Sequence, residues 1–242
     1  MALRARIGLI LLAICGGVLG WELLVGTGLT ILAPDMSEFW LYGVDKLGFA
    51  LALAGFLTYR RLWQRCGFAG GFQANAAHLL WPLWLIAGIS ALQGFADDDG
   101  GRIVGWFAIS AAVGFGEEGV FRGLIIAVLG ADRPRRAVLI SSILFGTLHL
   151  AGLLAPVDYR YILMQAVAAA CLGLVLGSAR LLTGSIWPGI TAHTALDFFG
   201  LAAAGGVMSA ADFSLGSAIV VLGSALVSFI WGIALWQRLP PD

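Results

Sequence analysis

Charged residues are scarce in this chain of 242 residues: only 12% are Asp, Glu, Lys or Arg, whereas 60% are hydrophobic. The mean hydropathy is correspondingly high, at +0.93. This balance excludes an ordinary soluble globular domain, in which about 25% of residues are charged. The composition therefore predicts a multi-pass protein of the cell membrane, surrounded by the lipid bilayer and without a nucleic-acid partner.

Cysteine is also rare. Cys15, Cys66 and Cys171 are odd in number and widely spaced, which excludes a disulfide framework and gives no sign of a thiol nucleophile. Long hydrophilic stretches are missing as well, since the longest hydrophilic connection covers about residues 59–73. With no convincing internal repeat, residues 1–242 are predicted to form a single transmembrane domain.

Apolar stretches of about 20 residues, the length with which a helix crosses the hydrocarbon layer, recur along the chain. We predict about eight transmembrane helices: residues 7–32, 40–58, 74–95, 103–129, 137–154, 159–179, 184–204 and 214–236. The predicted fold class is all-α, a polytopic integral membrane protein. Four of its helices are expected to form a conical or bundle-like core that carries the polar site described below.

Arginine is unevenly divided between the two sets of predicted loops. One set contains Arg4, Arg6, Arg60, Arg61, Arg65, Arg133, Arg135, Arg136, Arg180 and Arg238, and the other contains only Arg102 and Arg160. Cytoplasmic loops of membrane proteins carry an excess of basic residues. The arginine-rich side is therefore predicted to be cytoplasmic, and with eight helices both termini lie on that side.

Three ionisable clusters interrupt the apolar segments: Glu117-Glu118-x-x-x-Arg122, Phe145-x-x-x-His149 and His193-x-x-x-Asp197. A charged side chain at the bilayer centre costs roughly 2.5–3.5 kcal/mol on insertion scales, so such groups mark functional sites. At about 1.5 Å per residue, Glu117, His149 and His193 lie roughly 14–18 Å from the cytoplasmic ends of their predicted helices. This common depth predicts that the three clusters form one site.

The two neighbouring glutamates are predicted to differ in role. Residues four apart share one face of a helix, so Glu118 meets Arg122, whereas Glu117 points elsewhere. A carboxylate paired with arginine stays ionised and supports the structure, while an unpaired carboxylate in a dry site exchanges protons near neutral pH. Glu117 is therefore the predicted general base. His193 and Asp197 place an imidazole and a carboxylate on one face of another helix.

Two chemistries are compatible with this set of residues. His149, His193 and Asp197 provide the ligands that catalytic zinc uses, and Glu117 would then deprotonate a metal-bound water. Alternatively, the histidines stabilise a tetrahedral intermediate without metal while Glu117 activates water directly. The residues leave the choice open.

Three further charged residues lie within predicted helices. Glu22 comes late in the first predicted helix, and Asp45 and Lys46 lie about five residues inside the outer end of the second. Lysine at such a position extends its ammonium group to the membrane surface. These residues are therefore predicted to be interfacial rather than part of the site.

The order and spacing of the three clusters resemble the CPBP family of intramembrane proteases, also called the Abi or type II CAAX prenyl protease family. The resemblance covers about residues 100–200, the expected catalytic core. It implies an intramembrane endopeptidase that hydrolyses peptide bonds of a membrane-associated peptide or protein. By motif position, it implies that Glu117 is catalytic with His149 and His193 as partners, and that Glu118 and Arg122 are a supporting pair. Phe145, one turn before His149, is assigned a packing role.

The sequence departs from the family pattern at one position: Asp197 stands where the prenyl-protein processing members have Asn. Asn donates a hydrogen bond to an oxyanion and ionised Asp does not, so Asp197 is predicted to be a ligand, an orienter of His193, or protonated. The added negative charge favours zinc slightly.

Other functional classes are less compatible with the sequence than an endopeptidase is. The chain lacks a His-Glu-x-x-His helix, which argues against a site-2 type metalloprotease, and no serine has a convincing histidine partner of the rhomboid type. A proton-coupled transporter is an alternative because Asp, Glu and His also form proton relays, although the absence of a repeat argues against it. A non-enzymatic membrane scaffold or immunity protein is another.

Overall fold

The computed structural model describes residues 2–71, 74–96, 99–130, 132–154, 157–206 and 214–242. Within these residues all regular structure is helical, and no strand occurs, which confirms the all-α prediction. Three segments are composite. The first comprises α1 (Ala2–Trp21), the π-helix η1 (Glu22–Gly26) and α2 (Thr27–Leu32). The second comprises α5 (Gly100–Glu118), the π-helix η4 (Gly119–Ile125) and α6 (Ile126–Leu129), and the third comprises α7 (Pro134–His149) and the 3-10 helix η5 (Leu150–Leu154).

The remaining helices are simpler. They are α3 (Glu38–Arg60), η2 (Phe68–Gly70), η3 (Ala74–Leu80) with α4 (Trp81–Ala91), α8 (Tyr159–Thr183), α9 (Trp187–Ala204) and α11 (Leu215–Gln237). Proline lies in the first turn of both α7 and α9, where its missing N–H costs nothing. The Trp-Pro-Gly sequence before His193 is therefore the beginning of a helix. At the other end of α8, Gly184 has a φ of 71°, the left-handed conformation that ends many helices.

Each of the eight predicted ranges contains helix, but the number of membrane crossings is not confirmed as eight. By length and composition, five described helices are able to span a membrane: Ala5–Leu32, Glu38–Arg60, Pro134–Leu154, Tyr159–Thr183 and Leu215–Gln237. The apolar helix Ala76–Ala91 is shorter. The composite α5 segment and α9, which carry five of the ionisable residues of the predicted site, do not meet this criterion.

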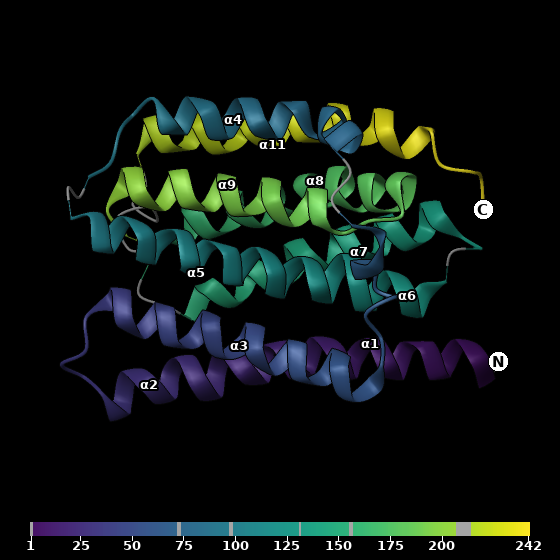
Figure 1. Ribbon diagram of the computed structural model, residues 1–242, viewed down its shortest axis with the longest axis horizontal. Helices are drawn as coiled ribbons and strands as arrows, with labels where there is room; N and C mark the ends of the chain where they lie inside the picture. Colours follow the sequence, from purple (N-terminus) through teal and green to yellow (C-terminus); the bar gives the residue numbers. More distant parts are fainter. Residues whose placement is uncertain (1, 72–73, 97–98, 131, 155–156, 207–213) are drawn as a thin grey trace.

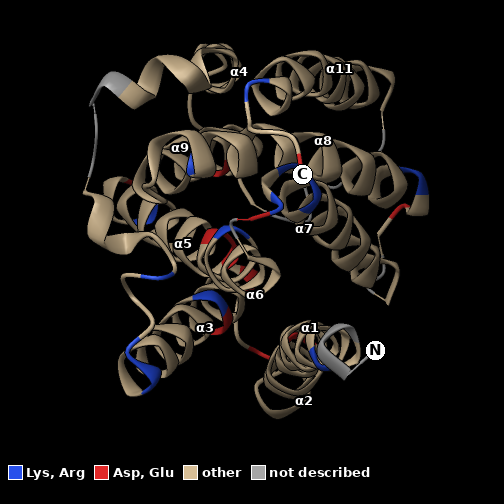
Figure 2. Cartoon of the chain, turned by 90° about the vertical axis from the view of Figure 1, so that its right-hand side faces the viewer, with Lys and Arg blue, Asp and Glu red and all other residues tan. Residues whose placement is uncertain are grey.

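Successive long helices alternate in direction, so the bundle has two distinct ends (Figure 1). We call the end that holds Arg60, Pro134, Thr183 and Gln237 the proximal end, and the end that holds Leu32, Gly100, Tyr159 and Leu215 the distal end. Both ends of the chain lie at the proximal end. Figure 2 looks onto it, with acidic residues visible inside the bundle around α5 and α3.

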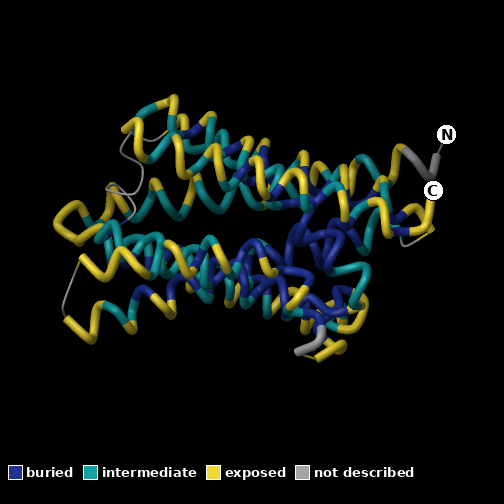
Figure 3. Tube along the Cα trace, turned by 90° about the horizontal axis from the view of Figure 1, so that it is seen from above, coloured by how far each residue is buried: buried dark blue, intermediate teal, exposed yellow. Residues whose placement is uncertain are grey.

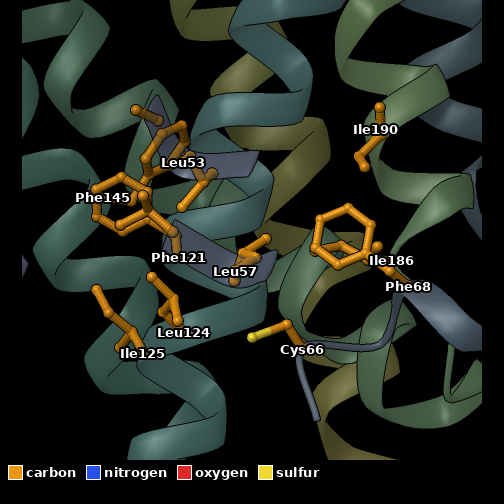
Figure 4. Close-up of a cluster of buried hydrophobic side chains, with 12 residues drawn as sticks. Leu53, Leu57, Cys66, Phe68, Phe121, Leu124, Ile125, Phe145, Ile186 and Ile190 are labelled. Atoms are coloured by element: carbon orange, nitrogen blue, oxygen red, sulfur yellow. The ribbon is translucent and has the colours of Figure 1, made fainter. Parts of the chain in front are cut away.

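The hydrophobic core fills the proximal half of the bundle. Buried residues gather toward this end, whereas the distal ends of the helices are exposed or only partly buried (Figure 3). The largest core cluster contains Leu53, Leu57, Cys66, Phe68, Val120, Phe121, Leu124, Ile125, Phe145, Ala169, Ile186 and Ile190 (Figure 4). It joins α3, η4, α7 and α9, and thereby fixes the helices that carry the predicted catalytic residues.

Glycine allows these helices to pack closely. A Cβ on Gly146 of α7 would lie 2.6 Å from the carbonyl oxygen of Ala166 on α8, and a Cβ on Gly114 of α5 would lie 2.7 Å from Oγ1 of Thr194 on α9. Real Cβ atoms do not approach other atoms so closely, so only glycine permits these contacts. Small residues at helix contacts are typical of membrane proteins. The close packing of α5 against α9 brings the Glu117 and His193 clusters together.

Candidate active site

Glu117 and Glu118 lie at the junction between α5 and η4. The helix does not stop there but widens into a π-helix over Gly119–Ile125. Short π-helical segments within α-helices occur frequently at functional sites. Every residue of η4 is buried, so this unusual backbone is held in place by packing on all sides.

Glu118 and Arg122 form the predicted ion pair. Arg122 Nη1 lies 3.0 Å from Glu118 Oε1, and each side chain is only 1% exposed. The same carboxylate oxygen also lies 3.0 Å from Nδ1 of His193 on α9. The spacing of four residues predicted the contact of Glu118 with Arg122 but not this second contact. Nothing in the spacing along the chain links Glu118 to a histidine 75 residues away.

His193 lies among three carboxylates. Its Nδ1 donates to Glu118, because an ionised carboxylate only accepts. Its Nε2 lies 3.6 Å from Glu117 Oε2 and 3.6 Å from Asp197 Oδ2. Glu117 and Asp197 are 28% and 29% exposed at their side chains, whereas His193 is 6% exposed. The buried imidazole is thus oriented from behind by Glu118 and faces two accessible carboxylates in front.

His149 approaches from a different helix. Its Nδ1 lies 2.8 Å from the carbonyl oxygen of Phe145, one turn earlier on α7. A carbonyl oxygen only accepts, so Nδ1 carries the hydrogen and Nε2 is the nitrogen left for other partners. His149, Glu117, His193 and Asp197 all line one cavity with a volume of about 1440 Å³. The structure therefore brings the four predicted catalytic residues to a common cavity.

Phe145 connects the charged groups beneath this cavity. The guanidinium carbon of Arg122 lies 4.2 Å from the centre of the Phe145 ring, a cation–π contact in a fully buried position. The same ring meets His149 edge-on at 4.7 Å and His193 at 6.0 Å between ring centres. Phe145 was predicted to serve packing, and its contacts show that it packs against both histidines and the supporting arginine.

A second charged cluster on the cavity wall corrects the prediction for Glu22, Asp45 and Lys46. The Lys46 ammonium lies 2.6 Å from Glu22 Oε1 and 2.9 Å from Asp45 Oδ2, and Trp21 Nε1 donates to Asp45 at 2.8 Å. The Lys46 side chain is only 13% exposed, so it binds these carboxylates instead of extending to a surface. Glu22 and Lys46, together with Tyr42, line the same cavity as Glu117.

A signal for this second cluster was present in the sequence. Opposite charges occurred near the same end of two consecutive predicted helices, which run antiparallel and therefore place Glu22 beside Lys46. The pairing satisfies both charges, whereas each alone would be costly in an apolar helix.

The fit to a zinc ion is partial. Both histidines donate from Nδ1 and leave Nε2 available, as metal-ligating histidines do. However, the described part of the chain contains no group of three or more His, Cys, Asp or Glu side chains placed to hold a metal ion. The arrangement of His149, His193 and Asp197 does not amount to such a group, so zinc binding stays a prediction.

These features define a class: a helical membrane protein whose helices enclose a cavity lined by carboxylates and imidazoles. Residues 99–199 match the family model described as Rce1-like: Type II CAAX prenyl endopeptidase Rce1-like. The resemblance drawn from the three motifs is thereby confirmed, and the match supports a CAAX prenyl protease-like membrane endopeptidase with a membrane-associated protein substrate. Searches among curated proteins and among solved structures gave no match.

Proposed function

We propose that the protein hydrolyses a peptide bond of a membrane-associated peptide or protein, using a water molecule activated by Glu117. The observation that carries this proposal is the unequal environment of the two glutamates. Glu118 is buried and bound to both Arg122 and His193, whereas Glu117 is partly exposed in the cavity, 3.6 Å from His193 Nε2. Of the two glutamates, only Glu117 lines the cavity, where a water molecule next to a substrate would lie.

In the proposed reaction, Glu117 takes a proton from water as the water oxygen attacks the carbonyl carbon of the substrate. The carbonyl π electrons move to the oxygen and create an oxyanion. The proton held by Glu117 then passes to the leaving nitrogen as the C–N bond breaks, which yields a carboxylic acid and an amine; proton transfer between them gives the carboxylate and the ammonium. General base catalysis of this kind contributes about 10²–10⁴-fold to a rate.

The oxyanion needs a hydrogen-bond donor or a positive charge. Glu118 fixes the Nδ1–H of His193, so a protonated His193 has its second N–H at Nε2, facing the cavity. The neighbouring carboxylates of Glu117 and Asp197, each 3.6 Å from Nε2, favour that charge. His193 is the proposed oxyanion donor, whereas His149, whose hydrogen is on Nδ1, presents an acceptor nitrogen at Nε2 across the cavity. Such preorganised donors supply much of the rate enhancement in acyl transfer.

Asp197 is proposed to hold His193 in its charged form rather than to contact the oxyanion. Its carboxylate lies one helical turn from His193 on the same face of α9 and accepts where the family's Asn would donate. The metal-dependent version of the site, with zinc on His149, His193 and Asp197, is the alternative chemistry. A proton-coupled transporter and a non-enzymatic scaffold or immunity protein are not favoured, because the matching family is one of endopeptidases.

The test is cleavage of a panel of labelled peptides by purified protein reconstituted in liposomes, with the products identified by mass. In ¹⁸O-labelled water, the new carboxyl end should gain the label, and Glu117→Gln should abolish cleavage. Asp197→Asn should retain more activity than Asp197→Leu, since the amide oxygen can still accept a hydrogen bond from the charged imidazole. Metal analysis and a strong chelator address zinc: cleavage that persists in a metal-free sample supports the metal-free reaction. Absence of cleavage with any membrane-associated peptide would contradict the proposal.

A further inference from the structure

The cavity that contains Glu117 extends from the distal helix ends past the middle of the bundle to the level of Phe121, and it does not reach the proximal helix ends that the structure describes. At the distal end it is lined by Thr30, Gln93, Leu154, Tyr161, Ser214 and Ser217, which lie at helix ends or in the connections between helices. Several of these residues are exposed, with Leu154 at 73%. Within the part of the chain that the structure describes, the cavity therefore extends to the distal end, where exposed residues line it.

The proximal end of the same cavity is closed by the hydrophobic core. Phe121 and Phe145 form part of the cavity wall at this level, and both are nearly fully buried. Beyond them lie Leu57, Ile125 and Ile186, which are 0%, 0% and 1% exposed. No residue at the proximal helix ends that the structure describes contributes to the lining of this cavity. The proximal end of the bundle, as far as the structure describes it, therefore offers no route to Glu117.

The closed end is the arginine-rich end. Arg60 and Arg61 end α3, Arg135 and Arg136 begin α7, and Arg180 and Arg238 lie at or near the proximal ends of α8 and α11. The described distal end has Arg102 and Arg160 together with Asp35, Glu38, Asp99 and Asp158. Basic residues accumulate in cytoplasmic loops, so this distribution assigns the proximal end to the cytoplasm.

We propose that the active-site cavity opens to the non-cytoplasmic face of the membrane. This inference rests on the proposed function and specifies its substrate class: a peptide segment of an exported protein, or of a membrane protein, presented from that face. Cytoplasmic chains meet the closed, core-filled end. The cavity lining and the core together define which end of the cavity is accessible, and the arginines assign that end to the non-cytoplasmic face.

The depth of the site sets a requirement on the substrate. Glu117 lies 17 residues after the beginning of α5 at Gly100, which is about 26 Å at ~1.5 Å per residue. An extended chain spans about 3.3 Å per residue, so roughly eight residues are needed to reach from the distal end to Glu117. The scissile bond must therefore lie in an unfolded segment at least that long.

Polar groups on the cavity wall suit an extended peptide. Gln165 of α8 lines the cavity, and its amide carries both donors and an acceptor, as a peptide group does. On α11, Ser217, Ser224 and Ser228 also line it, at positions that share one face of the helix. These side chains can bind substrate N–H and C=O groups that would otherwise lose their hydrogen bonds in an apolar cavity.

Thiol labelling tests the orientation without any need for catalysis. Thr30→Cys at the cavity mouth, Ser224→Cys within the cavity and Gln237→Cys at the proximal end are made singly after Cys15 and Cys171 are replaced by Ala. Cys66 is retained, because burial raises the pKa of its thiol to about 11 and at pH 7.5 less than about one thiol in a thousand is the reactive thiolate.

A small membrane-impermeant thiosulfonate is then added to intact cells and to inside-out vesicles. We expect Cys at positions 30 and 224 to react in cells, and Cys at position 237 to react only in inside-out vesicles. Reaction at position 224 from the same side as position 237 would overturn the proposal.

Substrate length provides the functional test. Reporter proteins carry a cleavable segment either four or twelve residues from a folded domain, and both are added to sealed liposomes of known orientation. The twelve-residue version should be cleaved and the four-residue version should not, and equal cleavage would contradict the depth argument. If labelling follows the expected pattern but wild-type protein cleaves neither version, the proposed function fails while the orientation stands.

Discussion

Exchange of each neighbouring glutamate for glutamine separates catalysis from structure. Glu117→Gln keeps the shape of the side chain and removes its ability to take a proton. Its carboxylate is 28% exposed, and its nearest charged partner is His193 at 3.6 Å. We expect little change in stability and a loss of about 10²–10⁴-fold in cleavage rate, equivalent to roughly 3–5 kcal/mol of activation free energy.

Glu118→Gln should act mainly on stability, because the amide oxygen can still accept the hydrogen bond from His193 Nδ1. The carboxylate is 1% exposed and lies 3.0 Å from both Arg122 Nη1 and His193 Nδ1. The substitution leaves the guanidinium buried without a counter-charge, and breaking such a pair costs about 3–5 kcal/mol of folding free energy. The expected loss is therefore about 3–5 kcal/mol of folding free energy for Glu118→Gln and roughly 3–5 kcal/mol of activation free energy for Glu117→Gln.

The assay measures thermal or denaturant unfolding in detergent beside peptide cleavage for each variant. The matched control is the double variant Glu118→Leu/Arg122→Met, which removes both charges together and should unfold closer to wild type than Glu118→Gln does. Two results would refute the reasoning: cleavage by Glu117→Gln at the wild-type rate, or equal loss of stability in Glu117→Gln and Glu118→Gln.

Three other predictions concern packing and the second charged cluster. Phe145→Leu should lower stability by about 2 kcal/mol, because the arginine above the ring loses a buried cation–π contact, and an unchanged unfolding midpoint would contradict this. Glu22→Gln and Lys46→Met should show a coupling of about 0.5–3 kcal/mol in a double-mutant cycle of unfolding, whereas additivity would mean that the 2.6 Å pair contributes nothing. Gly146→Ala should destabilise by about 1–3 kcal/mol because its Cβ would lie 2.6 Å from a carbonyl oxygen of α8. The control Gly55→Ala, with no atom within 4 Å of the new Cβ, should stabilise by up to about 1 kcal/mol, and similar effects at both positions would argue against a special role for Gly146.

The helices were predictable because the sequence of each segment is sufficient to indicate a helix. A run of apolar residues long enough to cross a membrane identifies a helix without knowledge of its neighbours, and the eight predicted ranges all contain helix. The Glu118–Arg122 pair was predictable for the same reason, since residues four apart meet on one helix. The depth argument that grouped Glu117, His149 and His193 also needed only helix geometry.

Contacts between helices were harder to anticipate. The bond between Glu118 and His193 depends on how α5 and α9 are rotated about their axes, which Gly114 and Thr194 determine at the crossing. The Lys46–Glu22 pair was assigned to the membrane surface because snorkelling satisfies a single lysine equally well. A sequence offers several ways to satisfy a charge, and only the packed neighbours select one.

Hydrophobicity, spacing and the cost of charge in lipid are properties of each segment alone, and they were enough to predict an all-helical membrane protein with carboxylates and imidazoles at one depth. The packing of the helices was needed to establish which nitrogen of each histidine faces the cavity, that Glu118 orients His193, and that the cavity is closed at the arginine-rich end. These features depend on side chains from several helices that pack together at close range, and the free energy of such packing cannot be inferred from the sequence of one helix alone.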